Sequence, residues 1–73
     1  MNSSPLTGSP LTAREIECLG LLARGLRHDV LASTLNVSVA TIEMHVVNAR
    51  RKLGAKTTTH AVAMAIARGL ISV

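Results

Sequence analysis

Only three residues, Asn36-Val37-Ser38, separate two segments with helical patterns of apolar residues, and this short link limits the fold more than any other feature. A connection of this length makes two helices cross sharply and leaves too little chain for an antiparallel hairpin. A close crossing needs a small residue in the first helix, which Ala32 supplies, and a residue tolerant of positive φ four positions later, which Asn36 supplies. Val37 is expected to fill the angle between the helices. We therefore predict a helix-turn-helix from Ala32 to Leu53, although a corner of an ordinary helical bundle satisfies part of the same pattern.

Start and stop signals predict an all-α fold of four helices. Thr12 followed by Glu15 is a capping box that begins the first helix, and Ser38 is a good N-cap for the third. Thr57 or Thr58 can cap the fourth. Residues able to adopt the left-handed conformation follow each segment. The expected helices span about 13–24, 28–35, 39–53 and 59–68.

The apolar pattern of the third predicted helix divides it into two faces. Ile42, Val46, Ala49 and Leu53 recur at spacings of four, three and four, which is typical of a stripe that packs on a core. The first helix carries a comparable stripe, and the second has an apolar face that is expected to include Val30. Leu70 and Ile71, after the fourth helix, can fold back onto the core. No segment alternates strictly between apolar and polar residues, so no strand is expected.

The length of 73 residues allows one domain at most, with a thin core. Residues 1–10 are rich in Ser, Gly and Pro and are expected to be a flexible lead-in, either the end of a linker from an upstream domain or a disordered terminus. Residues 11–73 form the predicted domain. Cys18 is the only cysteine, which excludes an intramolecular disulfide and fits a reducing cytoplasm.

Composition narrows the function classes. The formal net charge is +4, and Arg50, Arg51, Lys52 and Lys56 crowd one stretch, as phosphate binding requires. There are no aromatic residues, which argues against proteins that stack bases on aromatic platforms. There is no apolar run of membrane-spanning length and no signal peptide pattern, so we expect a cytoplasmic protein without membrane contact. The three histidines lack metal-ligand spacing, and no phosphate loop or carboxylate pair is present, so we expect no metal site, no cofactor, no catalytic residue and no enzyme activity.

Three motifs stand at fixed separations: LTxRE at 11–15, SxxTIxxH at 38–45, and the pair Lys52-Leu53. Together they resemble the LuxR-type (GerE-like) helix-turn-helix of bacterial transcription regulators. The resemblance extends over about residues 11–71. It implies a four-helix DNA-binding domain whose third helix enters the major groove and whose fourth helix commonly forms a dimer contact. It also implies a signal-sensing domain upstream, either ligand-binding or phosphoacceptor, in many members.

The resemblance also suggests a structural partner for Lys52, with Glu15 as the candidate. The chain departs from the family pattern at four positions. Val30 replaces an acid, Leu26 and Glu43 stand where basic residues are common, and Thr58 replaces an arginine. These changes leave the predicted fold intact and put the usual base contacts in question.

We expect the outer face of the third helix to read bases and its surroundings to bind phosphates. The predicted base-reading residues are Glu43, Met44 and Val47: the carboxylate can accept from cytosine N4, and the apolar pair can contact a thymine methyl. The predicted DNA-backbone residues are Ser38, Thr41, Asn48, Arg50, Arg51 and Arg27. For each arginine, a solvated surface position is the alternative.

The fourth predicted helix is apolar nearly all round, so one face should stay exposed after the core is covered. We predict a homodimer through Val62, Met64 and Ile66, bound to an inverted repeat of double-stranded DNA. Contact with a missing domain is the alternative for this face.

Three other functions compete with this hypothesis. Region 4 of a sigma factor shares a related helix-turn-helix, but the Thr-x-x-His motif and the apolar fourth helix speak against it. A protein-interaction module would use the fourth helix and the exposed face of the third. An enzyme is the weakest candidate.

Overall fold

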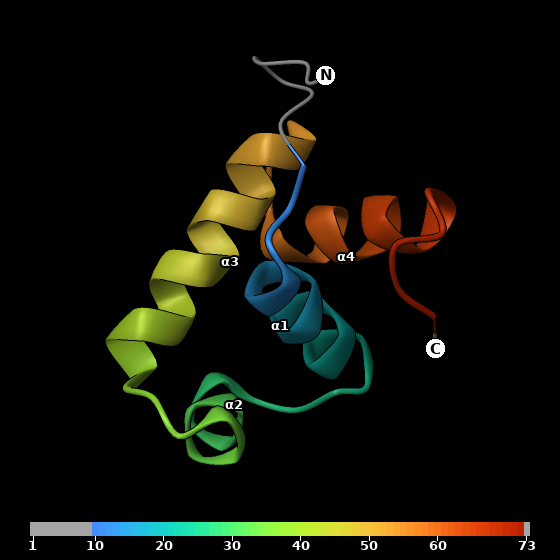
Figure 1. Cartoon of the computed structure of the whole chain (residues 1–73). Coiled ribbons are helices and arrows are strands. Elements are labelled where there is room, and N and C mark those ends of the chain that lie inside the picture. Colours follow the sequence, from blue (N-terminus) through green and yellow to red (C-terminus); the bar gives the residue numbers. More distant parts are fainter. Residues whose placement is uncertain (1–9, 73) are drawn as a thin grey trace.

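The computed structural model describes residues 10–72, and within them four α-helices form without any strand (Figure 1). The helices are α1 (Ala13–Ala23), α2 (His28–Leu35), α3 (Val39–Leu53) and α4 (Thr58–Ala67). The predicted all-α class is confirmed, and the bounds of α2 and α3 agree with the prediction. Apart from Pro10, the predicted lead-in lies outside the described residues.

The helices pack around α1 and α3, each of which contacts all the others, whereas α2 and α4 do not meet (Figure 1). The axes of α2 and α3 are bent by 107° relative to each other across their short link, which is the sharp crossing of a helix-turn-helix. Within residues 10–72, no single helix is long and apolar enough to cross a membrane. Only α2 and α3 taken together reach that length and apolar character, and the 107° bend lies between them.

Side-chain caps begin three of the four helices. At α1 the capping box is complete: the Glu15 N–H donates to Thr12 Oγ1 over 3.1 Å, and the Thr12 N–H donates to Glu15 Oε1 over 2.9 Å. Ser38 caps α3 as predicted. Thr57, of the two candidates, caps α4 by accepting from the His60 N–H, which is why this helix starts one residue earlier than expected.

All four helices end with the same backbone hydrogen bond. In each case an N–H donates to the carbonyl five residues earlier, as in Val37 to Ala32 over 3.0 Å. This geometry requires a left-handed residue at the penultimate position. Asn36 is that residue after α2, with φ of 59°, and within residues 10–72 it is the only residue other than glycine at positive φ. The predicted turn is therefore confirmed at the residue that was expected to make it.

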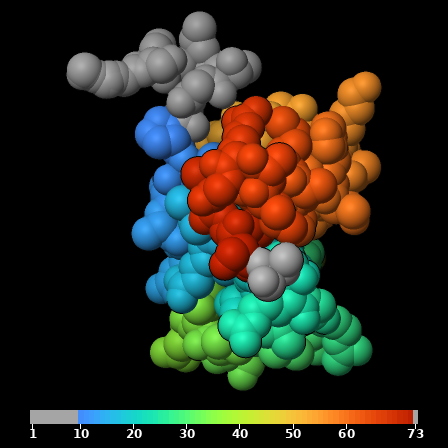
Figure 2. All heavy atoms as spheres, turned by 90° about the vertical axis from the view of Figure 1, so that its right-hand side faces the viewer, coloured from blue at the N-terminus to red at the C-terminus, as the bar shows by residue number. Residues whose placement is uncertain are grey.

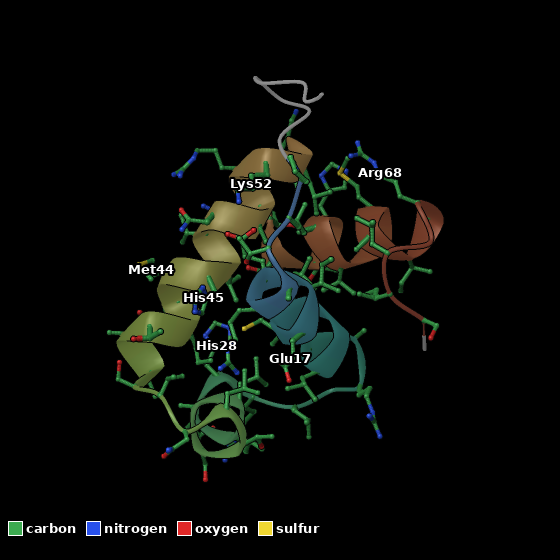
Figure 3. All side chains as sticks on the ribbon, in the orientation of Figure 1. Glu17, His28, Met44, His45, Lys52 and Arg68 are labelled. Carbon is green, nitrogen blue, oxygen red and sulfur yellow. The ribbon has the colours of Figure 1, made fainter. Side chains whose placement is uncertain are left out.

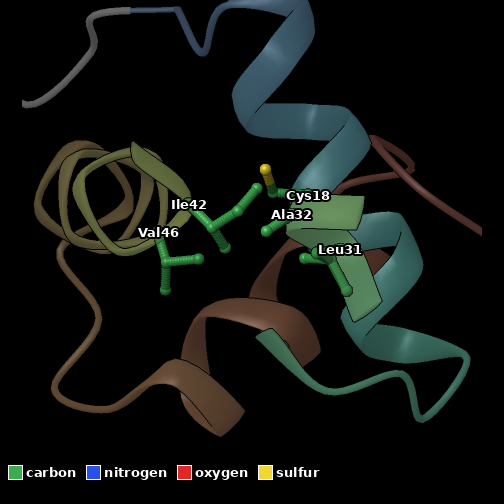
Figure 4. Packing of buried hydrophobic residues seen from close by; sticks show 5 residues of the cluster. All are labelled: Cys18, Leu31, Ala32, Ile42 and Val46. Atoms are coloured by element: carbon green, nitrogen blue, oxygen red, sulfur yellow. The ribbon is translucent and has the colours of Figure 1, made fainter. Parts of the chain in front are cut away.

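The core consists of two clusters, one on either side of Leu22. The first joins α1, α2 and α3, and its buried members are Cys18, Leu31, Ala32, Ile42 and Val46 (Figure 4). The second joins α1, α3 and α4, and its buried members are Leu19, Ala49, Leu53, Ala61 and Ala65. Val37 packs against the first cluster, as predicted, and Ile71 against the second.

The apolar residues after α4 and on α2 divide between core and surface. Leu70 and Val30 are 38% and 36% exposed, so the expectation that they pack inward is wrong for both. Val30 directly precedes the buried pair Leu31 and Ala32, and a helix turns by about 100° per residue, so its side chain leaves the face that contacts α3.

Candidate nucleic-acid interface

The two faces of α3 differ sharply in burial. Its inner stripe, predicted from the spacing, is at most 4% exposed at every position: Ile42, Val46, Ala49 and Leu53. On the outer face Met44 is 52% and Val47 is 42% exposed, and Glu43 is exposed beside them. Figure 3 shows Met44 pointing away from α1. The three predicted base-reading side chains therefore lie together on one surface that no other helix covers.

Glu43 brings the only acidic group to this surface. It forms no ion pair with any of the described residues, whose three ion pairs lie elsewhere. A carboxylate accepts hydrogen bonds and cannot donate them when ionised. The outer face of α3 thus offers one acceptor between two apolar side chains, with no cation at the three reading positions.

The N-terminus of α3 lies at the turn and presents hydroxyl groups. Ser38 Oγ accepts from the Thr41 N–H over 3.1 Å and lies 3.0 Å from Thr41 Oγ1. The first N–H groups of a helix have no partner within the helix and favour anions there. Ser38 is exposed and Thr41 half-buried, so both remain accessible at the end of the helix where a phosphate binds most readily.

The C-terminal half of α3 is basic. Arg51 is exposed and Arg50 half-buried. Arg51 Nη2 donates to Asn48 Oδ1 over 2.8 Å, so two predicted backbone-contact residues are joined to each other. The exposed Lys56 follows in the loop before α4.

Arg27 lies apart from α3, at the N-cap of α2. Its side chain is 80% exposed and forms a 3.4 Å ion pair with Asp29. A pair this exposed contributes little to stability and leaves the guanidinium free to move. Of the residues predicted to contact the DNA backbone, Arg27 is the only one that lies outside α3 and its N-cap.

Lys52 pairs with Glu15, as the resemblance suggested. Lys52 Nζ lies 3.0 Å from Glu15 Oε1 and 3.2 Å from Oε2, and the carboxylate side chain is only 4% exposed. Burial alone would raise the pKa of Glu15, but the hydrogen bond from the Thr12 N–H and the hydrogen bond and charge of Lys52 outweigh it and lower the pKa below 4.5. This pair joins α1 to α3 and removes Lys52 from the set of cations available to a ligand.

Cys18 is a core residue, fully buried in the first cluster. Burial raises the pKa of its thiol, and the negative charge of Glu17 adds to the effect. A thiol held in this way is a poor nucleophile. Within residues 10–72, no three His, Cys, Asp or Glu side chains come together as a metal site requires.

The surface of α4 differs in detail from the predicted dimer face. Ile66 is 38% exposed, whereas Val62 and Met64 pack partly against the second cluster. The exposed apolar strip follows another line, at spacings of three, one and three: Ala63, Ile66, Ala67 and Leu70. Figure 2 shows α4 as the outermost layer on its side of the molecule. Periodicity around Ile66 could have found this strip if Ala61 and Ala65 had been assigned to the core first.

Comparison with known proteins agrees with this geometry. Residues 9–65 match the family model described as bacterial regulatory proteins of the luxR family, GerE. The transcriptional regulatory protein MctR of Rhizobium johnstonii is 40% identical over 63 residues, which are 86% of this chain and 29% of MctR. The chain therefore spans less than a third of that relative.

Two solved structures are similar over most of the chain. The transcription factor GerE superposes with a TM-score of 0.83 at 31% identity, covering 88% of this chain and 96% of GerE. The Vibrio cholera VqmA structure, a complex with ligand and DNA, gives a TM-score of 0.80 at 33% identity and covers all of this chain and 32% of VqmA.

The fold and the outer face of α3 define a helix-turn-helix domain of the four-helix type. By the match over residues 9–65, the chain belongs to the LuxR family of bacterial regulatory proteins. This assignment confirms the predicted resemblance, and it places the chain among transcription regulators rather than enzymes.

Proposed function

We propose that this domain binds double-stranded DNA sequence-specifically, with α3 in the major groove. The observation that carries the proposal is the outer face of α3, where Glu43, Met44 and Val47 are exposed while the opposite face is fully packed. An α-helix fits the major groove, and side chains on its free face reach base edges there. The similar VqmA structure is a DNA complex, which supports the same mode.

The three outer residues favour particular bases. Glu43 can accept a hydrogen bond from the amino group of cytosine, and Met44 and Val47 can contact thymine methyl groups. Guanine, which is usually read by arginine or lysine, has no such partner at these three positions. We therefore expect a half-site in which the strand facing α3 presents cytosine next to thymine.

Phosphates on either side of the groove have separate partners. Ser38 and Thr41 present hydroxyls and helix N–H groups at one end of α3, and Asn48, Arg50 and Arg51 present donors toward the other. Arg27 would reach a phosphate from the start of α2. These contacts orient the helix and carry no sequence information directly.

We further propose that two copies bind an inverted repeat through α4. The exposed strip of Ala63, Ile66, Ala67 and Leu70 replaces Val62 and Met64 as the centre of this contact, with Ile66 common to both sets. Small residues permit close helix approach. A stable interface buries about 800 Å² per partner, roughly a fifth of the 4435 Å² surface of the chain, and one short strip supplies less. We therefore expect a monomer in solution and a dimer on DNA.

In the whole protein this domain would receive a signal from elsewhere in the chain. MctR is more than three times as long as the matched region, and VqmA about three times. The VqmA complex contains a ligand as well as DNA. We propose a signal-sensing domain upstream of residue 1 and action on DNA in the bacterial cytoplasm.

A selection from random-sequence duplexes tests the proposal. The domain should enrich an inverted repeat and bind it with an affinity that falls steeply with salt: neutralising about five phosphates per domain gives a slope of log affinity on log salt near −4.5 per domain. Glu43→Gln should shift the preferred base at one position of the half-site, since the amide can also donate. Arg24→Ala, at an exposed position after α1, is the matched control and should leave the enriched sequence unchanged.

Sedimentation with and without the enriched duplex tests the dimer. One copy per duplex that contains both half-sites would contradict pairing through α4. If the parent domain shows no salt-dependent DNA binding at all, the proposal fails, and a protein-interaction module using α4 and Met44 becomes the better explanation.

A further inference from the structure

The side chains of Asn48 and Arg51 are joined by a hydrogen bond, which the sequence alone does not predict. The 2.8 Å separation of Arg51 Nη2 and Asn48 Oδ1 is shorter than the 3.3 Å and 3.4 Å of the two surface ion pairs. Among the described residues 10–72, Arg51 is the only basic residue of α3 whose side chain forms a hydrogen bond to another side chain of α3. Arg50 forms none within this range. Arg51 also has no carboxylate partner among these residues.

The chemistry of the two side chains determines what the pair can bind. A guanidinium has only donors, so the oxygen of the Asn48 amide must face Arg51 and its NH₂ group must point elsewhere. The bond from Arg51 occupies one lone pair of that oxygen and fixes the orientation of the amide, so a two-point contact to adenine, which needs both the oxygen and the nitrogen, would have to use the second lone pair in an amide plane already set by Arg51. The free groups of the pair are therefore mostly donors, and they carry one positive charge, a combination that matches phosphate oxygens better than a base edge.

The position of the pair on α3 agrees with a phosphate at the edge of the groove. Met44, Val47, Asn48 and Arg51 are offset by three, four and seven residues, which places them along one side of the helix. Seven residues correspond to about 10 Å along the helix axis, and the major groove is about 12 Å wide. If Met44 lies over the bases, Arg51 is far enough from it along α3 for its long side chain to reach a phosphate at the edge of the groove.

We propose that Asn48 is a positioning residue, which holds the guanidinium of Arg51 toward a single backbone phosphate. This inference rests on the proposed DNA binding and adds that the two side chains act as one unit. An arginine held in place before binding loses less side-chain freedom when it meets the phosphate. Asn48 therefore strengthens binding through Arg51 and equally on every DNA sequence.

A double-mutant cycle tests this coupling. Asn48→Ala, Arg51→Ala and the double variant are titrated at several KCl concentrations against a 20-base-pair random-sequence duplex pool and against the duplex that the parent enriches from it. Arg51→Ala should weaken binding about 10-fold and reduce the salt slope by about 0.9. Asn48→Ala should weaken binding about 3-fold in the parent and have almost no further effect in the Arg51→Ala background.

Arg50→Ala is the matched control because Arg50 is the neighbouring arginine and lacks the bond to Asn48. In the Arg50→Ala background, Asn48→Ala should keep its full effect. Thermal unfolding of all variants should stay close to that of the parent, since none of the three side chains belongs to the buried core.

Two outcomes would overturn the inference. If Asn48→Ala lowers the DNA affinity equally in the parent and in the Arg51→Ala background, Asn48 acts on DNA independently of Arg51. A loss confined to one base pair of the enriched duplex would show that it reads a base. Both differ from failure of the proposed function, in which the parent itself would not bind either duplex in a salt-dependent way.

Discussion

The inner and outer faces of α3 are both rich in apolar side chains, yet they serve different purposes. Val46 and Val47 are adjacent in sequence and chemically identical, but Val46 is 3% exposed and Val47 is 42% exposed. The inner face is enclosed by α1, α2 and α4, and the outer face by nothing among residues 10–72. A single exposed apolar residue needs no partner, but Met44 and Val47 lie together on one face. The comparison therefore separates the face that holds α3 in place from the face that α3 offers to a partner. Substitutions on the inner face should therefore change the free energy of unfolding most, and substitutions on the outer face least.

Shortening Ile42 should have the largest effect. Ile42 is fully buried in the first cluster, where α2 and α3 cross (Figure 4). Ile42→Ala should lower the free energy of unfolding by about 2–5 kcal/mol, which in a domain this small approaches complete unfolding. Urea titration followed by circular dichroism measures it. Ile42→Val should cost only about 0.5–1.5 kcal/mol, and equal losses for both variants would contradict a packed site.

The scaffold of this domain could be predicted from its sequence because the signals are local. Spacing identified the inner stripe of α3, the pair Thr12 and Glu15 identified the start of α1, and Asn36 identified the turn. Each of these follows from the geometry of a single helix or helix end. The start of α4 stayed open because two adjacent residues, Thr57 and Thr58, offered the same capping chemistry, and Thr57 is the cap.

The surfaces were harder to predict because burial depends on partners far away in the sequence. The fourth helix is apolar nearly all round, so its sequence alone did not show that Val62 and Met64 would lean on the core while Ala63 and Ala67 would not. The sequence also did not show that Cys18 would be fully buried in the core, because only its small size suggested this. The bond between Asn48 and Arg51 depends on the orientation of two flexible side chains, which spacing allows and does not require.

Removing the charge of Lys52 should have the next largest effect. Lys52→Met leaves the Glu15 carboxylate buried without its cation, and because Lys52 is itself partly exposed we expect a loss of about 1–3 kcal/mol rather than the larger cost of a fully enclosed pair. Urea titration at pH 7 measures the loss. If Lys52→Met is as stable as the parent, the hydrogen bond from the Thr12 N–H is by itself enough to stabilise the buried Glu15 carboxylate.

The pair should also make stability depend on pH. The pKa of Glu15 is lowered below 4.5 in the folded state, so the unfolded chain binds the proton more readily. Its stabilisation is present above about pH 4.5 and is lost as the pH falls through the folded pKa. Glu15→Gln keeps a group that can complete the capping box and removes the charge. Its unfolding free energy should therefore change less than that of the parent between pH 6 and pH 3.

A smaller effect is expected at the turn that directs α3 away from α2. Asn36 has φ of 59°, a conformation that alanine adopts at a cost of about 1 kcal/mol more than asparagine. Asn36→Ala should lower the unfolding free energy by about that amount, whereas Asn36→Gly should stay within about 0.5 kcal/mol of the parent. Thermal unfolding of the three proteins measures the difference. If glycine proves as harmful as alanine, the asparagine side chain, and not the backbone conformation, stabilises the turn.

The smallest effect on stability should come from Val47, and here the two faces can be compared with one chemical change. Val47→Ala removes two methyl groups that are already largely in water, so the unfolding free energy should change by no more than about 0.5 kcal/mol. Val46→Ala, the matched change on the inner face, should cost about 2 kcal/mol. On the duplex enriched by the parent the order should reverse once both proteins are folded at low temperature: Val47→Ala should bind several-fold more weakly and Val46→Ala almost as well as the parent. A Val47→Ala domain that keeps both its stability and its DNA affinity would leave this exposed valine without a role, and base reading would then rest on Glu43 and Met44 alone.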